Sequence, residues 1–350
     1  MSINNRFSIA KTKEGLGETE LNKKNSVRPK RRNELGFEFL ESKNLLTAVA
    51  FDSGAGLLEF TAVDGAADVL EVSALDTDFL QLQLGNGAGF VLEDDALSNP
   101  DFELSTTVNT DDTLTINTQN VDIADFSVDL GDLDDVFEIA GLVGVDNVTV
   151  LGGTGNDTIS GAGADQALTL IGNQGNDILI GGSGDDLLVG GGGTDTIDGG
   201  AGIDTNSFQG IGIGVEATVN ADGTGTAVYG AVNESFVGIE NLTGSENDDV
   251  LTALGAAANV LRGEGGDDIL AGGGGTDVID GGEGIDTNSF QNIGFGVTAT
   301  VNADGTGTAV YGAVNESFVS IENLTGSEND DVLIALGAAA NVLRLSLIHI

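Results

Sequence analysis

Aspartate recurs at the sixth position of a nine-residue unit along much of the chain. Residues 152–160 read GGTGNDTIS, and later units such as 181–189 (GGSGDDLLV) and 263–271 (GEGGDDILA) repeat the pattern. The glycines permit positive φ, so a six-residue turn can aim several backbone carbonyls at one point while the aspartate adds a hard anionic oxygen. A set of about six oxygen ligands without nitrogen or sulfur is typical of Ca²⁺ rather than Zn²⁺, and Mg²⁺ demands a tighter octahedron. The unit therefore predicts calcium sites.

The units fall into a first array at 151–207, a second at 244–289 and a truncated third at 326–344. In two units Gln166 and Asn259 replace the aspartate, so we expect weaker binding or none there. The predicted metal ligands are the remaining position-six aspartates, namely Asp157, Asp177, Asp186, Asp195, Asp204, Asp249, Asp268, Asp277, Asp286 and Asp331.

Two consecutive units form one 18-residue coil, so every second turn stacks on the same side, about 4.8 Å from the next. A cation between two such turns receives carboxylate and carbonyl oxygens from both. The pairs expected to share an ion are Asp157–Asp177, Asp177–Asp195, Asp186–Asp204, Asp249–Asp268 and Asp268–Asp286.

The eighth position of each unit carries leucine or isoleucine in a three-residue strand whose alternation points it inward. These residues are Ile159, Leu168, Leu179, Leu188, Ile197, Leu251, Leu261, Leu270 and Ile279, and Asn206 and Asn288 interrupt the series where each array ends. We predict an all-β chain whose arrays form a right-handed parallel β-roll, a calcium-binding solenoid.

A longer repeat lies over the nine-residue one. Residues 190–262 match 272–344 at an offset of 82, with seven differences in 73 positions. Each copy joins nonapeptide units to a β-rich insert, at 208–243 and 290–325. Such near-identity indicates duplication within a modular tandem protein.

Upstream of the arrays, residues 48–150 show short alternating strands separated by Asp, Gly and Asn turns, which predicts an all-β region. The predicted strands are Leu57–Ala62, Val69–Ser73, Leu80–Leu84, Thr113–Ile116 and Val148–Leu151. This pattern fits either a sandwich or irregular coils of the solenoid that follows. Residues 1–47 are polar and of mixed charge, and we interpret them as a flexible basic leader.

The repeats resemble those of the RTX (repeats-in-toxin, haemolysin-type calcium-binding) family, and the SFVGIENLTGS and SFVSIENLTGS stretches are similar to its inter-array segments. The resemblance covers roughly residues 150–344. It implies a β-roll that folds on meeting millimolar extracellular Ca²⁺, and a secreted or cell-surface protein. A second resemblance, between residues 31–48 and a segment near the start of many exported bacterial proteins, agrees with export.

The formal net charge of −44 is unevenly distributed along the chain. Residues 1–43 carry ten of the twelve basic residues and six glutamates, a net +4, which leaves −48 for the rest. Such an acidic body repels nucleic acid and anionic lipid, and no apolar run is long enough to span a bilayer. Calcium ions are the expected partners, and the sequence leaves a cell-surface or matrix partner open.

Catalytic residues are not apparent. The chain has no cysteine, and its one histidine, His349, lies in the terminal LSLIHI. This hexapeptide breaks the 82-residue repeat after Arg344, so we predict that residues 345–350 are non-native and that the chain is truncated. We predict calcium binding with calcium-induced folding and no enzyme activity. The alternatives are the carrier part of a secreted hydrolase whose catalytic domain is missing, or a cell-surface adhesin.

Overall fold

The computed structural model describes residues 46–52, 57–61, 69–76, 79–84, 89–92, 104–105, 113–117, 123–139, 145–336 and 341–345, and side chains from residue 125 onward. The predicted leader (except Leu46 and Thr47), most of the predicted export segment, and residues 346–350 of the predicted tail lie outside these ranges. The regular elements of the described residues are all β-strands, and no helix among them is long and apolar enough to cross a membrane. The prediction of an all-β chain is confirmed.

The strands have the following bounds. The first seven are β1 (Leu46–Asp52), β2 (Leu57–Thr61), β3 (Val69–Asp76), β4 (Phe79–Leu84), β5 (Gly89–Leu92), β6 (Leu104–Ser105) and β7 (Thr113–Asn117). The next nine are β8 (Ile123–Asp129), β9 (Val136–Ile139), β10 (Val145–Thr154), β11 (Thr158–Ser160), β12 (Leu168–Gln174), β13 (Ile178–Ile180), β14 (Leu187–Gly192), β15 (Thr196–Asp198) and β16 (Thr205–Ser207). Then come β17 (Glu216–Val219), β18 (Gly225–Tyr229), β19 (Val232–Val237), β20 (Asn241–Thr243), β21 (Val250–Ala253), β22 (Val260–Arg262), β23 (Ile269–Ala271) and β24 (Val278–Asp280). The last seven are β25 (Thr287–Ser289), β26 (Thr298–Val301), β27 (Gly307–Tyr311), β28 (Val314–Val319), β29 (Asn323–Thr325), β30 (Val332–Ala335) and β31 (Leu343–Arg344).

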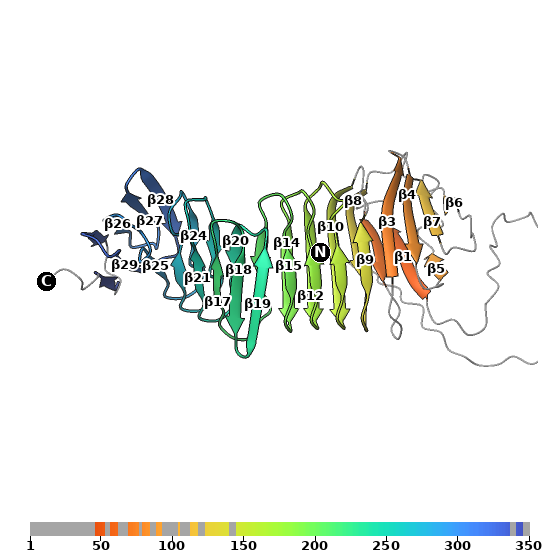
Figure 1. Ribbon diagram of the computed structural model, residues 1–350, viewed down its shortest axis with the longest axis horizontal. Helices are drawn as coiled ribbons and strands as arrows, with labels where there is room; N and C mark the ends of the chain where they lie inside the picture. The colour runs from red at the N-terminus through yellow and green to blue at the C-terminus, as the bar shows by residue number, and fades with distance from the viewer. Residues whose placement is uncertain are drawn as a thin grey trace, which may run out of the picture. The chain divides into compact units, whose positions relative to one another are not determined.

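These strands form two sheets, one of 15 strands and one of 16. From β8 to β16 the chain alternates between the sheets, and each strand pairs in parallel with the strand one coil away. Figure 1 shows these strands side by side along the solenoid. Ile178 pairs with Thr196, a spacing of one 18-residue coil, whereas Thr158 pairs with Ile178 because the unit between them carries two extra residues. The structure is a β-roll, as predicted.

The upstream region continues the same two sheets. Strand β2 pairs in parallel with β8, and β3 with β9, while β1–β2 and β3–β4–β7–β6 pair antiparallel. Each of the five strands predicted from the alternation overlaps an observed one. The solenoid coils begin at β8 and β9, within the predicted N-terminal β region.

The inward side chains form a continuous core between the sheets. All nine leucines and isoleucines predicted at position eight are at most 2% exposed. Phe236 and Leu242 continue this core past the first insert, since they pair with Ile197 and Asn206. Asn206 and Asn288 are themselves fully buried, at the ends of the arrays where the sequence indicated an interruption.

Each insert adds an antiparallel hairpin to one sheet only. Strands β19, β18 and β17 stand between β15 and β21 in the 16-stranded sheet, while β20 alone stands between β16 and β22 in the other. The duplicate strands β28, β27 and β26 lie in the 15-stranded sheet. One 82-residue cassette, β15 to β23, holds nine strands, an odd number. Successive cassettes therefore present their inserts on opposite sheets.

Replacing Leu179 by alanine should destabilise the folded protein by about 2–5 kcal/mol, because a cavity would remain between stacked coils. Urea unfolding measures this loss. The control is Ile178→Ala in the same strand, where the side chain is 40% exposed and the cost should be about 1 kcal/mol or less. Equal losses in the two variants would contradict the inward packing of position eight.

Candidate calcium sites

The turns between the two sheets lie in two stacks. The first turn column leads from the 15-stranded to the 16-stranded sheet, and the second turn column leads back. The first column contains the turns 152–157, 172–177, 190–195, 244–249, 263–268 and 281–286. The second contains 161–166, 181–186, 199–204, 254–259, 272–277 and 326–331. Every predicted ligand is the last residue of one of these turns.

Within a column, one carboxylate oxygen of an aspartate accepts a hydrogen bond from the backbone of the preceding turn in that column. Asp177 Oδ1 accepts a hydrogen bond of 2.8 Å from the backbone N–H of Asp157, and Asp204 Oδ1 does the same for Asp186. Equivalent bonds of 2.8–2.9 Å join Asp177 to Asp195, Asp249 to Asp268 and Asp268 to Asp286. The structure thus brings together all five pairs predicted from the spacing.

The second oxygen of most of these aspartates faces no donor. Asp186 and Asp249 differ, since their Oδ2 atoms accept bonds of 2.6 Å from the N–H groups of Gly182 and Ser245. Among the described residues, buried Oδ2 atoms without a hydrogen-bond partner belong to Asp157, Asp177, Asp195, Asp204, Asp268, Asp277, Asp286 and Asp331. A buried anionic oxygen without a partner is costly, and a cation could compensate its charge.

The glycine at position one has no side chain, and this lets the Asp Oδ2 atom lie close to its Cα. A Cβ added at Gly172 would lie 2.2 Å from Asp177 Oδ2 and 2.6 Å from the carbonyl oxygen of Gly190, one coil further on. At Gly181 the same two neighbours are Asp186 Oδ2 at 2.4 Å and the Gly199 oxygen at 2.1 Å. The free carboxylate oxygen and the next turn's carbonyl therefore meet at one place. These hard oxygens fit a calcium ion, with the paired aspartates as anionic ligands and turn carbonyls beside them.

Burial makes the charged form of these aspartates unfavourable in the absence of a cation. Desolvation is the largest cause, and it raises the pKa of Asp157, Asp177 and Asp286 to about 6. The pKa rises to about 7 for Asp204, Asp268 and Asp277. Repulsion within the column adds to this, as from Asp249 and Asp286 on Asp268. A divalent cation would reverse both effects.

The two irregular units lose the charge, and only the Asn259 unit keeps the backbone bond to the next turn. The backbone N–H of Asn259 donates to Asp277 Oδ1 at 2.9 Å, although Asn259 itself carries no carboxylate. Gln166 is the degenerate residue opposite Asp186, whose Oδ1 instead accepts a bond from the Leu168 N–H at 2.7 Å. Asp331 accepts a bond of 2.9 Å from Val297 of the second insert.

One residue of the same column escaped the sequence analysis. The N–H of Asp135 donates to Asp157 Oδ1 at 2.8 Å, so the turn ending at Asp135 extends the first column by one coil. Its unit, residues 130–138, reads LGDLDDVFE and lacks the paired glycines. The available signal was an aspartate two residues before the apolar Phe137, which is fully buried.

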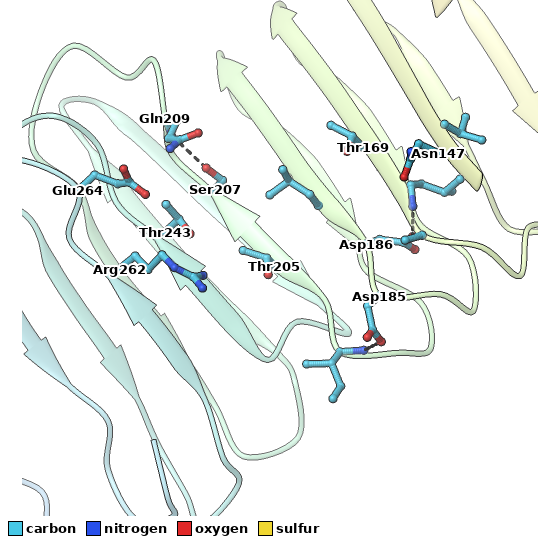
Figure 2. Close-up of a pocket in the computed structure, with 15 residues that line it drawn as sticks. Asn147, Thr169, Asp185, Asp186, Thr205, Ser207, Gln209, Thr243, Arg262 and Glu264 are labelled. Atoms are coloured by element: carbon cyan, nitrogen blue, oxygen red, sulfur yellow. Dashed lines mark hydrogen bonds between the residues drawn. The ribbon is translucent and has the colours of Figure 1, made fainter. Parts of the chain in front are cut away.

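A polar hollow of about 410 Å³ lies on the outer face of the 15-stranded sheet. Figure 2 shows Thr169 and Thr205 lining it, with Arg262 and Glu264 toward one end and Asp185 toward the other. The lining combines exposed strand and turn residues with buried ones such as Leu168 and Asp186. Of the predicted calcium ligands, Asp186 alone lines this hollow.

Comparison with known proteins agrees with this geometry. The family model of the RTX calcium-binding nonapeptide repeat matches the chain in four copies, over residues 144–166, 171–205 and 254–287. These ranges contain eight of the ten predicted ligands, all except Asp249 and Asp331. No curated protein matches the chain in sequence. The resemblance inferred from the nonapeptide units is confirmed.

Replacing Gly172 by alanine should raise the calcium concentration needed for half-saturation by about tenfold, since the new methyl group displaces Asp177 or the backbone of Gly190 at a cost of about 1–3 kcal/mol. Calorimetric titration with calcium measures this shift. Gly294→Ala is the control, because nothing lies within 4 Å of the added Cβ there. A Gly172→Ala protein that binds calcium as the control does would contradict the role assigned to position one.

Proposed function

We propose that this chain, a protein with RTX calcium-binding nonapeptide repeats, binds calcium ions through the paired aspartates of its stacked turns. We propose further that it completes its folding when these ions bind. Calcium binding in a repeat protein is supported by the family match. The ligand assignment and the coupling to folding are inferences from the geometry of the turn columns.

The observation that carries the proposal is the series of buried Oδ2 atoms without partners, repeated one coil apart in both columns. Most of these oxygens lie on buried aspartates, such as Asp157 and Asp204, while Asp331 is half-buried. Folding without a cation would bury a column of like charges or force their protonation. A calcium ion between two turns cancels two charges, so its binding free energy becomes folding free energy.

This coupling suits a protein that works outside the cell. Extracellular calcium modules bind with dissociation constants of about 10⁻⁴–10⁻³ M, far above the concentration at which cytosolic sensors respond. A chain with such sites remains unfolded where calcium is scarce and folds where it is abundant. We infer a secreted or cell-surface protein.

The tandem cassettes favour a repetitive surface protein over the carrier part of a hydrolase. The two inserts are near-identical and lie on opposite sheets, which presents the same hairpin on two sides of one solenoid. The comparisons find calcium-binding repeats and no catalytic domain. An adhesin or matrix role follows from multivalent display.

Alanine substitution of a column aspartate tests the ligand assignment. Asp186→Ala and Asp268→Ala should each raise the half-saturating calcium concentration by about tenfold or more, because each removes a charged ligand that two turns share. Titration calorimetry, with circular dichroism to follow folding, measures the effect.

The matched control is Asp222→Ala. Asp222 is exposed in the hairpin loop of the first insert, where it accepts bonds from Thr224. Its removal should leave calcium binding unchanged. Equal effects of the three substitutions would refute the assignment of ligands to the turn columns.

A further inference from the structure

The two turn columns differ in structure at the point where an insert enters the solenoid. Strand β16 pairs Thr205 with Asn241, which sets Glu240 level with Asp204 in the second turn column. Strand β15 pairs Thr196 with Ser235, which sets Glu234 level with Asp195 in the first turn column. A glutamate therefore stands at the sixth position of the next coil on both sides, although neither belongs to a nonapeptide unit.

Glu240 continues the aspartate ladder of its column. Its Oε2 atom accepts a hydrogen bond of 2.9 Å from the backbone N–H of Asp204, the same bond that joins aspartates within an array. The turn that ends at Glu240, residues 238–240, is only three residues long. The longer glutamate side chain compensates for the shorter turn.

The other groups of a calcium site are present beside Glu240. Asp204 is fully buried, and its Oδ2 atom has no hydrogen-bond partner among the described residues. A Cβ at Gly199 would lie 2.8 Å from this oxygen and 2.0 Å from the carbonyl oxygen of Gly238 in the next turn. The same arrangement occurs at Gly172 inside the array, beside the unpartnered Asp177 Oδ2. The unpartnered oxygen thus faces the gap between Asp204 and Glu240.

The second cassette repeats this arrangement independently. Glu322 Oε2 accepts a bond of 2.9 Å from the N–H of Asp286, whose Oδ2 is again buried without a partner. A Cβ at Gly281 would lie 2.5 Å from that oxygen and 2.0 Å from the carbonyl oxygen of Ser320. The junction keeps its geometry even though Ser320 replaces Gly238 and the second insert lies in the other sheet.

Glu234 differs because a tyrosine occupies one of its carboxylate oxygens, Oε2, while Oε1 is buried without a hydrogen-bond partner in the described part of the chain. The hydroxyl of Tyr229 donates to Glu234 Oε2 at 2.8 Å and lies 3.2 Å from the carbonyl oxygen of Gly193. The Tyr229 ring packs against Phe208, with the ring centroids 6.2 Å apart. At Gly190 the three atoms nearest to an added Cβ all belong to Asp195, so no carbonyl of a following turn lies among them.

The second insert closes its column in the same way. Tyr311 donates to Glu316 Oε2 at 2.7 Å, and its hydroxyl lies 3.2 Å from the carbonyl oxygen of Gly273. The three nearest atoms at Gly272 again belong to the turn's own aspartate, Asp277. A phenol hydroxyl therefore fills the end of this column too.

We propose that each junction holds one further calcium ion, between Asp204 and Glu240 in the first cassette and between Asp286 and Glu322 in the second. The opposite column ends at the Tyr229–Glu234 or Tyr311–Glu316 pair, where the tyrosine hydroxyl occupies one glutamate oxygen and no carbonyl of a following turn lies among the nearest atoms at Gly190 or Gly272. The series of stacked calcium sites therefore continues past each insert in one turn column only. That column is the second in the first cassette and the first in the second cassette. This inference rests on the proposed function of the turn columns.

Counting bound calcium on the folded full-length chain tests the proposal. Equilibrium dialysis with radioactive calcium at saturation gives the number of ions per molecule, and circular dichroism verifies the fold. Glu240→Gln and Glu322→Gln should each lose one ion, and the double variant should lose two. Glu234→Gln is the matched control, a buried glutamate at the same level of the other column, and it should keep the full number.

Unchanged stoichiometry in Glu240→Gln and Glu322→Gln would overturn the proposal, as would an equal loss in Glu234→Gln. If the glutamine variants fail to fold, Glu240→Asp keeps the charge and should weaken one site by about tenfold, and an unchanged titration would equally overturn it. Asp186→Ala distinguishes failure of the junction site from failure of calcium binding by the turn columns. Loss of an ion there with no loss at Glu240 rejects the junction site alone, whereas a wild-type chain that binds no calcium rejects the function itself.

Discussion

The fold depends on one interaction, the sharing of a buried aspartate between two stacked turns. One carboxylate oxygen, Oδ1, fixes the backbone of the preceding turn by a hydrogen bond of 2.8–2.9 Å. The other oxygen is buried with the negative charge and has no protein donor at most positions. Such a charge is tolerated in a protein interior only when it is compensated. We propose that calcium compensation decides whether the coils can stack.

The remaining features of the nonapeptide follow from that requirement. Position one is glycine in most units because its neighbours are the Asp carboxylate oxygen and a carbonyl of the next turn, as at Gly172. Position eight is apolar in most units because its side chain lies between the two sheets, where Leu179 and Leu188 are fully buried. Several array strands, such as β11, β13 and β15, are only three residues long, so the core is narrow there and the turns contribute to stability.

The repeated pattern made most of the arrays predictable from the sequence. The spacing of eighteen residues determined which aspartates stack, and the apolar eighth position determined the inward face. Asp135 was missed because its unit lacks glycine pairs, so no motif marks it although it stands in the same column. Glu240 and Glu234 were missed because their level in the columns depends on strand register across an insert. The exchange of sheets between cassettes depends on a strand count that only the structure supplies. The predicted leader and most of the terminal tail lie outside the described residues.

Far-ultraviolet circular dichroism of the full chain during a calcium titration tests the coupling of binding to folding most directly. Starting in chelator, the strand signal should rise between about 0.1 and 10 mM calcium, vanish again when chelator is added, and not appear with magnesium at the same concentrations. A strand signal that is the same in chelator and in 10 mM calcium would show that the turn columns are stable without the ion, and would contradict the account.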